Sequence, residues 1–199
     1  MKNIIPYGRQ QIDDADIQSV VDVLRSDWLT TGPAVEKFES AVAEYVGARY
    51  AVAVANGTAA LHVACCAAGI GPGDEVITSP ITFLASANCA LYCGGRPVFA
   101  DVLSDTITIN PAEIARQVTS RTKAVIPVHF AGHPCHMDAI HAIAEQNNLI
   151  VIEDAAHALG ALYKGKRIGA CDRSDMAILS FHPVKHITTG EGGMVLTNN

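Results

Sequence analysis

Short apolar runs alternate with stretches of helical periodicity along most of the chain. From residue 50 onward the runs are rich in Val, Ile and Ala, which is typical of strands buried on both faces. Between them, apolar residues recur at spacings of three and four, which predicts helices. The predicted strands are 50–55, 75–79, 97–101, 123–128, 149–153, 175–181 and 193–197. The predicted helices between them are 58–69, 83–92, 111–118 and 136–147.

Two further helices are predicted ahead of this alternating region. Asp13 can cap a helix that ends near Ser26, and Pro33 opens a second helix that continues to Val46. A hairpin is expected over residues 161–168. Strands that alternate with helices imply an α/β fold with a mainly parallel sheet and helices on both faces.

Composition narrows the class of protein. With 49% apolar and 17% charged residues among 199, the chain is typical of a globular domain. A net charge of −6 argues against a nucleic-acid partner, and no apolar run is long enough to span a membrane. The first six residues lack the apolar centre of a signal peptide. The six cysteines form no CxxC pair, so we expect reduced, buried thiols and a cytoplasmic location.

Lys185 and Asp154 are the most informative residues. Each follows a predicted buried strand, so both are expected at one edge of the sheet. A lysine can hold an aldehyde as a Schiff base, and a buried carboxylate can pair with a pyridinium nitrogen. The combination indicates pyridoxal phosphate (PLP). In isolation, Lys185 could equally be a solvated surface lysine and Asp154 a helix N-cap.

Other segments fit the same cofactor. Gly57 and Thr58 follow a strand and open a helix, where first-turn N–H groups favour a phosphate, although a plain glycine turn would look the same. Ser180 could donate a hydroxyl to that phosphate. Phe83 could lie over a planar ring or be a core residue at a helix start. No G-x-G-x-x-G motif supports the alternative of a nicotinamide-dependent enzyme.

Four side chains in one loop could suggest a metal site: His129, His133, Cys135 and His136. Gly132 and Pro134 break any helix there, and no H-E-x-x-H motif is present. We therefore expect no metal and place these histidines near the cofactor or substrate.

Taken together, the segments resemble the DegT/StrS-type nucleotide-sugar aminotransferases, a branch of the aspartate-aminotransferase-like PLP enzymes. The likeness runs in the family's order over nearly the whole chain. The matching segments are 29–33, 56–61, 80–83, 153–160, 180–185 and 190–193. Residues 5–10 and 187–189 look closest to the C4 transaminases of pseudaminic acid synthesis, which act on a UDP-linked 4-keto-6-deoxy-N-acetylhexosamine.

The resemblance implies roles for individual residues. Lys185 would be the catalytic residue that bonds the cofactor and moves a proton between donor and cofactor. The other implied contacts are the pyridinium nitrogen for Asp154, the ring face for Phe83, the phenolic oxygen for His157, and the phosphate for Gly57, Thr58 and Ser180. The partners would be a nucleotide-linked ketosugar and glutamate as amino donor. Related sugar 3-dehydratases carry histidine in place of the lysine, so Lys185 favours transamination.

The likeness also implies a domain plan. We expect residues 1–33 to form an N-terminal arm and helix, and 34–199 to form the PLP-binding large domain of a homodimer. The chain ends directly after a predicted strand, so we expect the small C-terminal domain of such enzymes to be absent. Apolar surface left uncovered would then promote association. The alternative is an inactive or regulatory N-terminal fragment that keeps the PLP-binding fold.

Overall fold

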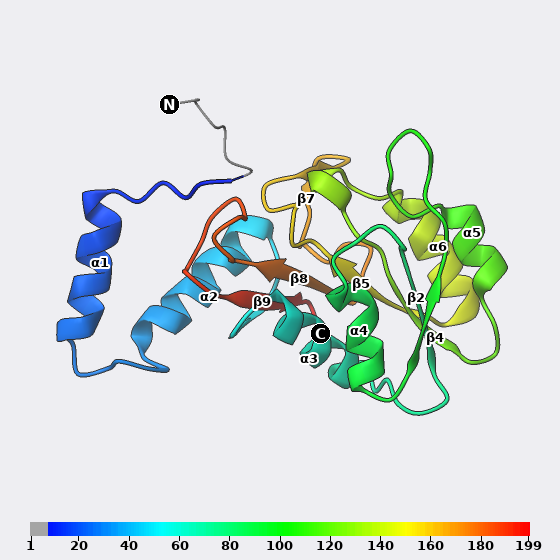
Figure 1. Ribbon diagram of the computed structural model, residues 1–199, viewed down its shortest axis with the longest axis horizontal. Helices are drawn as coiled ribbons and strands as arrows, with labels where there is room; N and C mark the ends of the chain where they lie inside the picture. The colour runs from blue at the N-terminus through cyan, green and yellow to red at the C-terminus, as the bar shows by residue number, and fades with distance from the viewer. Residues whose placement is uncertain (1–7) are drawn as a thin grey trace, which may run out of the picture.

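The computed structural model describes residues 8–199, whose centre is a seven-stranded sheet (Figure 1). Residues 5–7 of the opening motif lie outside this described part. The strands, in spatial order, are β1 (Tyr50–Val54), β9 (Gly193–Thr197), β8 (Met176–Ser180), β5 (Ile150–Asp154), β4 (Thr122–Ile126), β2 (Glu75–Thr78) and β3 (Arg96–Phe99). Neighbours from β8 to β3 are parallel, whereas β9 runs opposite to both β1 and β8. The predicted, mainly parallel sheet is confirmed.

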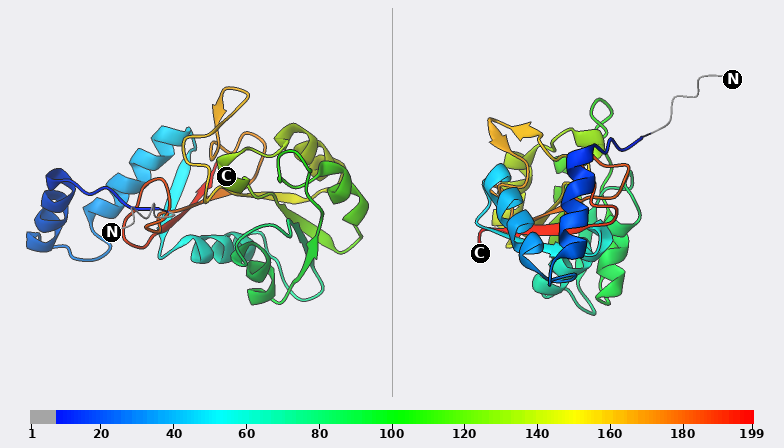
Figure 2. Two further views of the ribbon diagram at one scale, coloured as in Figure 1. Left: turned by 45° about the horizontal axis from the view of Figure 1, so that its top comes forward. Right: turned by 90° about the vertical axis from the view of Figure 1, so that its left-hand side faces the viewer.

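Helices cover both faces of the sheet (Figure 2). One face packs on α3 (Gly57–Ala67) and α4 (Ala85–Tyr92), and the other on α2 (Pro33–Val46), α5 (Pro111–Gln117) and α6 (Met137–Asn147). Successive strand residues point to opposite faces, so Ile152 packs with the α3 and α4 residues while Val151 packs with those of α5 and α6. This alternation produced the unbroken apolar runs of the sequence.

Helix α1 (Asp14–Arg25) stands apart from the sheet in Figure 1 and in the left view of Figure 2. Asp13 caps it as predicted: its side chain accepts from the N–H groups of Ala15 and Asp16, and the Asp16 carboxylate accepts from the Asp13 N–H. None of its residues is buried. The predicted hairpin is also present, as β6 (Leu162–Tyr163) paired with β7 (Lys166–Arg167).

Two further expectations, on membrane spans and on cysteine burial, can be compared with the structure. Among residues 8–199, no helix is both long and apolar enough to cross a lipid bilayer. Four of the six cysteines are buried as expected, but Cys66 is exposed and Cys93 is only partly covered. The expectation of buried thiols is wrong for these two, because Cys66, unlike its neighbour Cys65, does not point into the core, and Cys93 lies beyond the last turn of α4.

Candidate functional site

A pocket of about 360 Å³ opens where the carboxyl ends of several strands meet. β1, β5 and β8 all end there, because these strands point in the same direction through the sheet. All the residues predicted to contact the cofactor line this one pocket: Gly57, Thr58, Phe83, Asp154, His157, Ser180 and Lys185. Segments more than a hundred residues apart in sequence are thus brought together.

Asp154 is the last residue of β5 and is 6% exposed. Its neighbour Glu153 points to the opposite face of the strand, so only Asp154 reaches the pocket. The Ser86 hydroxyl on α4 donates to Asp154 Oδ2 at 2.6 Å, and the Ala156 N–H donates to Oδ1 at 3.2 Å. A turn rather than a helix follows the strand, so the alternative of a helix N-cap is wrong.

The surroundings of Asp154 fit a positively charged ligand group. Within the described part of the chain, the donors on its carboxylate are a neutral hydroxyl and a neutral amide. Buried charges in proteins are usually paired with an opposite charge, which these two neutral donors do not supply. The protonated ring nitrogen of PLP supplies such a cation, and hence the donor set here fits the cofactor.

Lys185 lies in the loop between β8 and β9, where its N–H donates to the His182 carbonyl at 2.9 Å. Its side chain is half-buried in the pocket, so the alternative of a fully solvated lysine is wrong. Burial lowers the pKa of the Lys185 amine, and the negative charge of Asp154 opposes this only in part. A larger fraction of the amine is therefore neutral and nucleophilic than in a free lysine.

His157 lies a short turn beyond Asp154 and is half-buried. Desolvation lowers the pKa of its imidazole, and the positive charge of Lys185 lowers it further. Because a protonated imidazole is disfavoured there, the ring is available as a neutral hydrogen-bonding group.

The start of α3 lines the same pocket. The Asn56 side chain caps this helix by accepting from the Ala59 N–H at 2.8 Å. The N–H groups of Gly57 and Thr58 belong to the first turn, where the helix offers them no carbonyl partner. A Cβ on Gly57 would lie 2.9 Å from the Ser180 Cβ. Glycine therefore lets the start of α3 approach the end of β8, and this N-terminus is suited to an anion.

Glycines lie at 190, 192 and 193, where the chain enters β9. In the structure, a Cβ on Gly193 would lie 2.3 Å from the Asn56 carbonyl carbon, so the close approach is to the chain just ahead of α3. Gly190, with φ of +81°, makes the turn that leads into β9.

Phe83 precedes α4 and lines the pocket. Its side chain is 67% exposed, so the alternative of a core phenylalanine is wrong. A large aromatic ring left uncovered beside a cavity is suited to contact a planar ligand.

His129 is buried, and both nitrogens of its ring have hydrogen-bond partners. Its Nε2 lies 2.7 Å from Glu153 Oε2, and its Nδ1 accepts from the Cys135 N–H at 3.1 Å. Nδ1 therefore carries the lone pair and Nε2 the proton. With both ring nitrogens engaged, the imidazole has none to offer a metal. The His129 N–H also donates to the Asp154 carbonyl at 3.1 Å, which ties this network to the pocket.

Sequence reasoning missed Ser86 and Thr82. The Thr82 and Ser86 hydroxyls lie 2.7 Å apart, and Ser86 in turn holds Asp154. One signal was present: Ser86 comes three residues after Phe83, which places both on one side of the first helical turn. That signal did not show which strand end Ser86 would meet.

Comparison with known proteins extends these observations. The spore coat polysaccharide biosynthesis protein SpsC of Bacillus subtilis is 49% identical over 197 residues, which cover 99% of this chain and 50% of SpsC. A Streptococcus pneumoniae protein described as a sugar aminotransferase, solved in a PLP-form and a PMP-form, superposes with a TM-score of 0.94 at 34% identity. The match to its PLP-form covers 98% of this chain and 53% of that one.

A third similar protein is Helicobacter pylori PseC, described as an aminotransferase involved in the biosynthesis of pseudoaminic acid. It superposes with a TM-score of 0.90 at 32% identity, over 98% of this chain and 52% of PseC. The chain thus spans about half the length of the relatives it matches. Residues 10–199 match the family described as DegT/DnrJ/EryC1/StrS aminotransferases. On this match over nearly its whole length, the chain belongs to the DegT/DnrJ/EryC1/StrS aminotransferase family.

Proposed function

We propose that this chain carries the PLP site of an aminotransferase that aminates a nucleotide-linked ketosugar. The observation that carries the proposal is the meeting of Lys185 and Asp154 in one pocket, which the start of α3 also lines. The pocket offers one partner for each of three groups of the coenzyme. The amine suits its aldehyde, and the helix start suits its phosphate. The carboxylate, which has no cationic partner in residues 8–199, suits its ring nitrogen.

Each residue has a distinct task in this proposal. When bound, PLP supplies an aldehyde and an electron-withdrawing ring. Lys185 would be the catalytic residue: its partly desolvated Nζ would hold the coenzyme through its aldehyde, with release of water, and would then accept and return a proton. Asp154, held by Ser86, would pair with the ring nitrogen. The remaining proposed contacts are the phosphate for Gly57, Thr58 and Ser180, the ring face for Phe83, and the phenolic oxygen for His157.

The substrate class is supported by the relatives. SpsC is named for polysaccharide biosynthesis, and PseC for pseudoaminic acid biosynthesis. We therefore propose amino-sugar synthesis for a surface polysaccharide or glycan, with glutamate as the amino donor. A finer proposal is amination at C4 of a UDP-linked 4-keto sugar, supported by the likeness to PseC.

We also propose that residues 34–199 form the coenzyme-binding domain, residues 1–33 an arm, and the protein a homodimer. The exposed apolar side of α1 supports the last point. A cytoplasmic location is supported by the six free cysteines, which are typical of a reducing compartment.

The proposal is tested by adding PLP to the purified chain and recording the visible absorption of lysine-bound coenzyme. Borohydride reduction followed by peptide mass spectrometry should then locate the coenzyme on Lys185. Lys185→Ala should abolish both signals. Lys164→Ala is the matched control, because this exposed lysine pairs with Asp138 outside the pocket.

Glutamate should convert the bound coenzyme to its amine form, with loss of the visible band. A chain that binds PLP at Lys185 but never reacts with glutamate would favour the alternative of an inactive fragment. Coenzyme attached to lysines other than Lys185, or not attached at all, would contradict the proposed site itself.

A further inference from the structure

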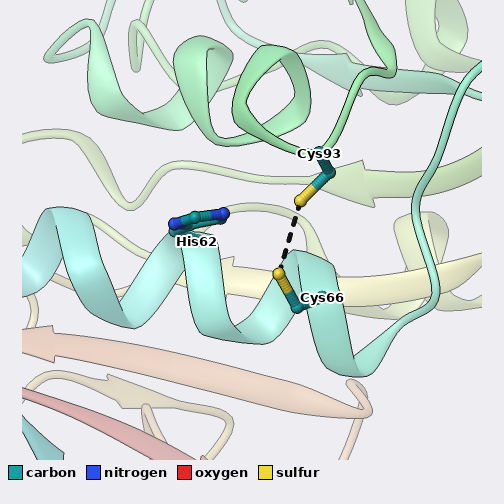
Figure 3. A group of neighbouring side chains, drawn as sticks. All are labelled: His62, Cys66 and Cys93. Atoms are coloured by element: carbon teal, nitrogen blue, oxygen red, sulfur yellow. Dashed lines mark hydrogen bonds between the residues drawn. The ribbon is translucent and has the colours of Figure 1, made fainter.

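A second group of reactive side chains lies away from the coenzyme pocket, between α3 and α4 (Figure 3). His62 and Cys66 are four residues apart on α3 and therefore share one side of the helix. Cys93 follows the last turn of α4 and lies 27 residues from Cys66 in sequence. Figure 3 shows the two thiols pointing toward each other with the imidazole beside them.

The spacing of the donor atoms is that of a metal centre. The two Sγ atoms lie 3.6 Å apart, and one donor atom from each of the three residues lies within 4.8 Å of the others. A tetrahedral zinc ion with ordinary bond lengths separates two sulfurs by about 3.8 Å, and a sulfur and a nitrogen by about 3.5 Å. The sulfurs thus already stand at the required distance, and only the imidazole needs a small movement. A disulfide would need the sulfurs to close to about 2.05 Å.

The surroundings allow an ion to enter. Cys66 is exposed, and His62 and Cys93 are partly exposed, so the group opens to solvent on one side. The His62 ring packs edge-on against Tyr92, with ring centroids 5.4 Å apart, which restricts its orientation. Three protein ligands and one open position are the arrangement of zinc sites that keep a water or an exchangeable ligand.

We propose that His62, Cys66 and Cys93 bind a thiophilic metal ion, Zn²⁺ foremost, with solvent in the fourth position. Two thiolates and an imidazole select zinc or copper(I) over magnesium or calcium. No sequence motif indicates this site, because Cys93 lies far along the chain from the other two ligands. The proposed site departs from our expectation that the chain holds no metal. The proposal is independent of the proposed transamination.

Metal binding at this position would join the two helices that cover one face of the sheet. Their other ends line the coenzyme pocket, α3 at Gly57 and α4 at Ala85. An ion that binds the folded chain and not the unfolded chain stabilises the fold by mass action. We therefore expect Zn²⁺ to raise the unfolding temperature of the reduced chain.

The test titrates the reduced, purified chain with Co²⁺ and then displaces it with Zn²⁺. We expect one ion per chain, intense d–d bands of tetrahedral cobalt, and thiolate-to-cobalt charge transfer that Zn²⁺ removes. His62→Ala, Cys66→Ser and Cys93→Ser should each weaken Zn²⁺ binding by at least about 100-fold, since loss of even an outer-sphere partner costs about 10–100-fold. His141→Ala, a histidine paired with Glu145 on α6, and Cys65→Ala, a buried thiol, should bind like the parent chain.

A second measurement keeps the test decisive if a variant folds poorly. Alkylation of the parent chain, read by mass spectrometry, should slow at Cys66 and Cys93 when Zn²⁺ is present. Equal alkylation rates with and without the ion would overturn the proposal. So would a cobalt spectrum without thiolate charge transfer, or full binding retained in all three ligand variants.

Discussion

Ser86 on α4 donates its hydroxyl to Asp154 Oδ2 at 2.6 Å, across 68 residues of sequence. Both side chains are buried, and the hydroxyl of Thr82 lies 2.7 Å from that of Ser86. The contact fixes one carboxylate oxygen at the end of β5 and attaches α4 to that strand. The orientation of the proposed pyridinium partner thus depends on a serine that belongs to a different layer of the fold.

Replacing Ser86 by alanine should lower the free energy of unfolding by about 1–3 kcal/mol, because a buried carboxylate loses a hydrogen-bond donor. Under the proposed function, PLP should stabilise the parent chain more than the variant, since Ser86 fixes the carboxylate that faces the ring nitrogen. Urea unfolding with and without PLP measures both effects.

The control for this variant is Ser19→Ala. The Ser19 hydroxyl bonds to the Ala15 carbonyl on the exposed surface of α1, so its loss should change stability by less than about 0.5 kcal/mol. If Ser86→Ala were as stable as the parent chain, Ser86 would not be supporting Asp154. If PLP stabilised both chains equally, the pairing of Asp154 with a cation would be in doubt.

The elements of the fold could be predicted from the sequence, because strands buried on both faces leave unbroken apolar runs and helices leave a regular period. The capping carboxylate of Asp13 and the turn at Gly165 are local signals of the same kind. Each depends on residues that are neighbours in the chain. Contacts of this kind can therefore be predicted from a short stretch of sequence.

Contacts between elements could not be predicted in this way. The partner of Ser86 depends on how α4 packs beside β5, and the partner of His129 is Glu153, 24 residues away. Neither period nor composition specifies the strand order that brings them together. The proposed metal ligands could not be predicted from the sequence for the same reason. His62 and Cys66 lie on one helix, and Cys93 lies beyond the end of another.

Gly57→Ala should destabilise the chain by about 1–3 kcal/mol, because its Cβ would lie 2.9 Å from the Ser180 Cβ in a packed contact. Ser180→Gly in the same chain should recover most of that stability by removing the opposing side chain. It should not recover PLP affinity, since the proposed phosphate contact of Ser180 is lost with its hydroxyl. Thermal unfolding and PLP titration of both single variants and the double variant separate the two effects. Additive losses of stability would show that the two residues do not oppose each other.

Lys185 should lose its proton at a lower pH than an ordinary lysine. Burial lowers the pKa of its amine below the usual 10.5, and the charge of Asp154 opposes that shift. Competitive acetylation across pH, followed by mass spectrometry, should give a midpoint for Lys185 below 10.5. Asp154→Asn should move this midpoint lower still, because it removes the opposing negative charge.

The control for the Lys185 titration is Asp172→Asn, which removes a carboxylate that pairs with Lys166 outside the pocket. It should leave the Lys185 midpoint unchanged. A midpoint at or above 10.5 in the parent chain would show that burial does not lower the pKa of Lys185 and would weaken its proposed role as nucleophile.

Glu75 should contribute to stability only above strongly acid pH. Its buried carboxylate accepts from Thr119, Arg96 and Arg121, and these hydrogen bonds lower its pKa from 4.5 to about 2. Since the folded chain holds the proton less tightly than the unfolded chain, this stabilisation is complete above pH 4.5 and is lost as the pH falls toward 2. Glu75→Gln should cost about 1–3 kcal/mol at neutral pH, and the difference from the parent chain should vanish near pH 2.

Urea unfolding at several pH values measures the contribution of Glu75. Glu113→Gln is the control, because Glu113 pairs with Arg116 at the surface of α5 and should contribute less than about 1 kcal/mol at any pH. A difference between Glu75→Gln and the parent chain that stays constant from neutral pH to pH 2 would contradict the assignment of the pH dependence to this carboxylate.

Helix α1 should be required for self-association. Ile17, Val20 and Leu24 are 54–63% exposed and recur at helical spacing along one side of a helix that has no buried residue. An exposed apolar stripe of this kind is typical of a surface that contacts another protein. The proposed homodimer offers such a surface, so Val20→Asp with Leu24→Asp should shift the chain toward monomer in sedimentation analysis. Gln18→Asp with Asp22→Asn changes polar positions of the same helix and should leave the association unchanged. Equal association of both double variants would show that the interface lies elsewhere.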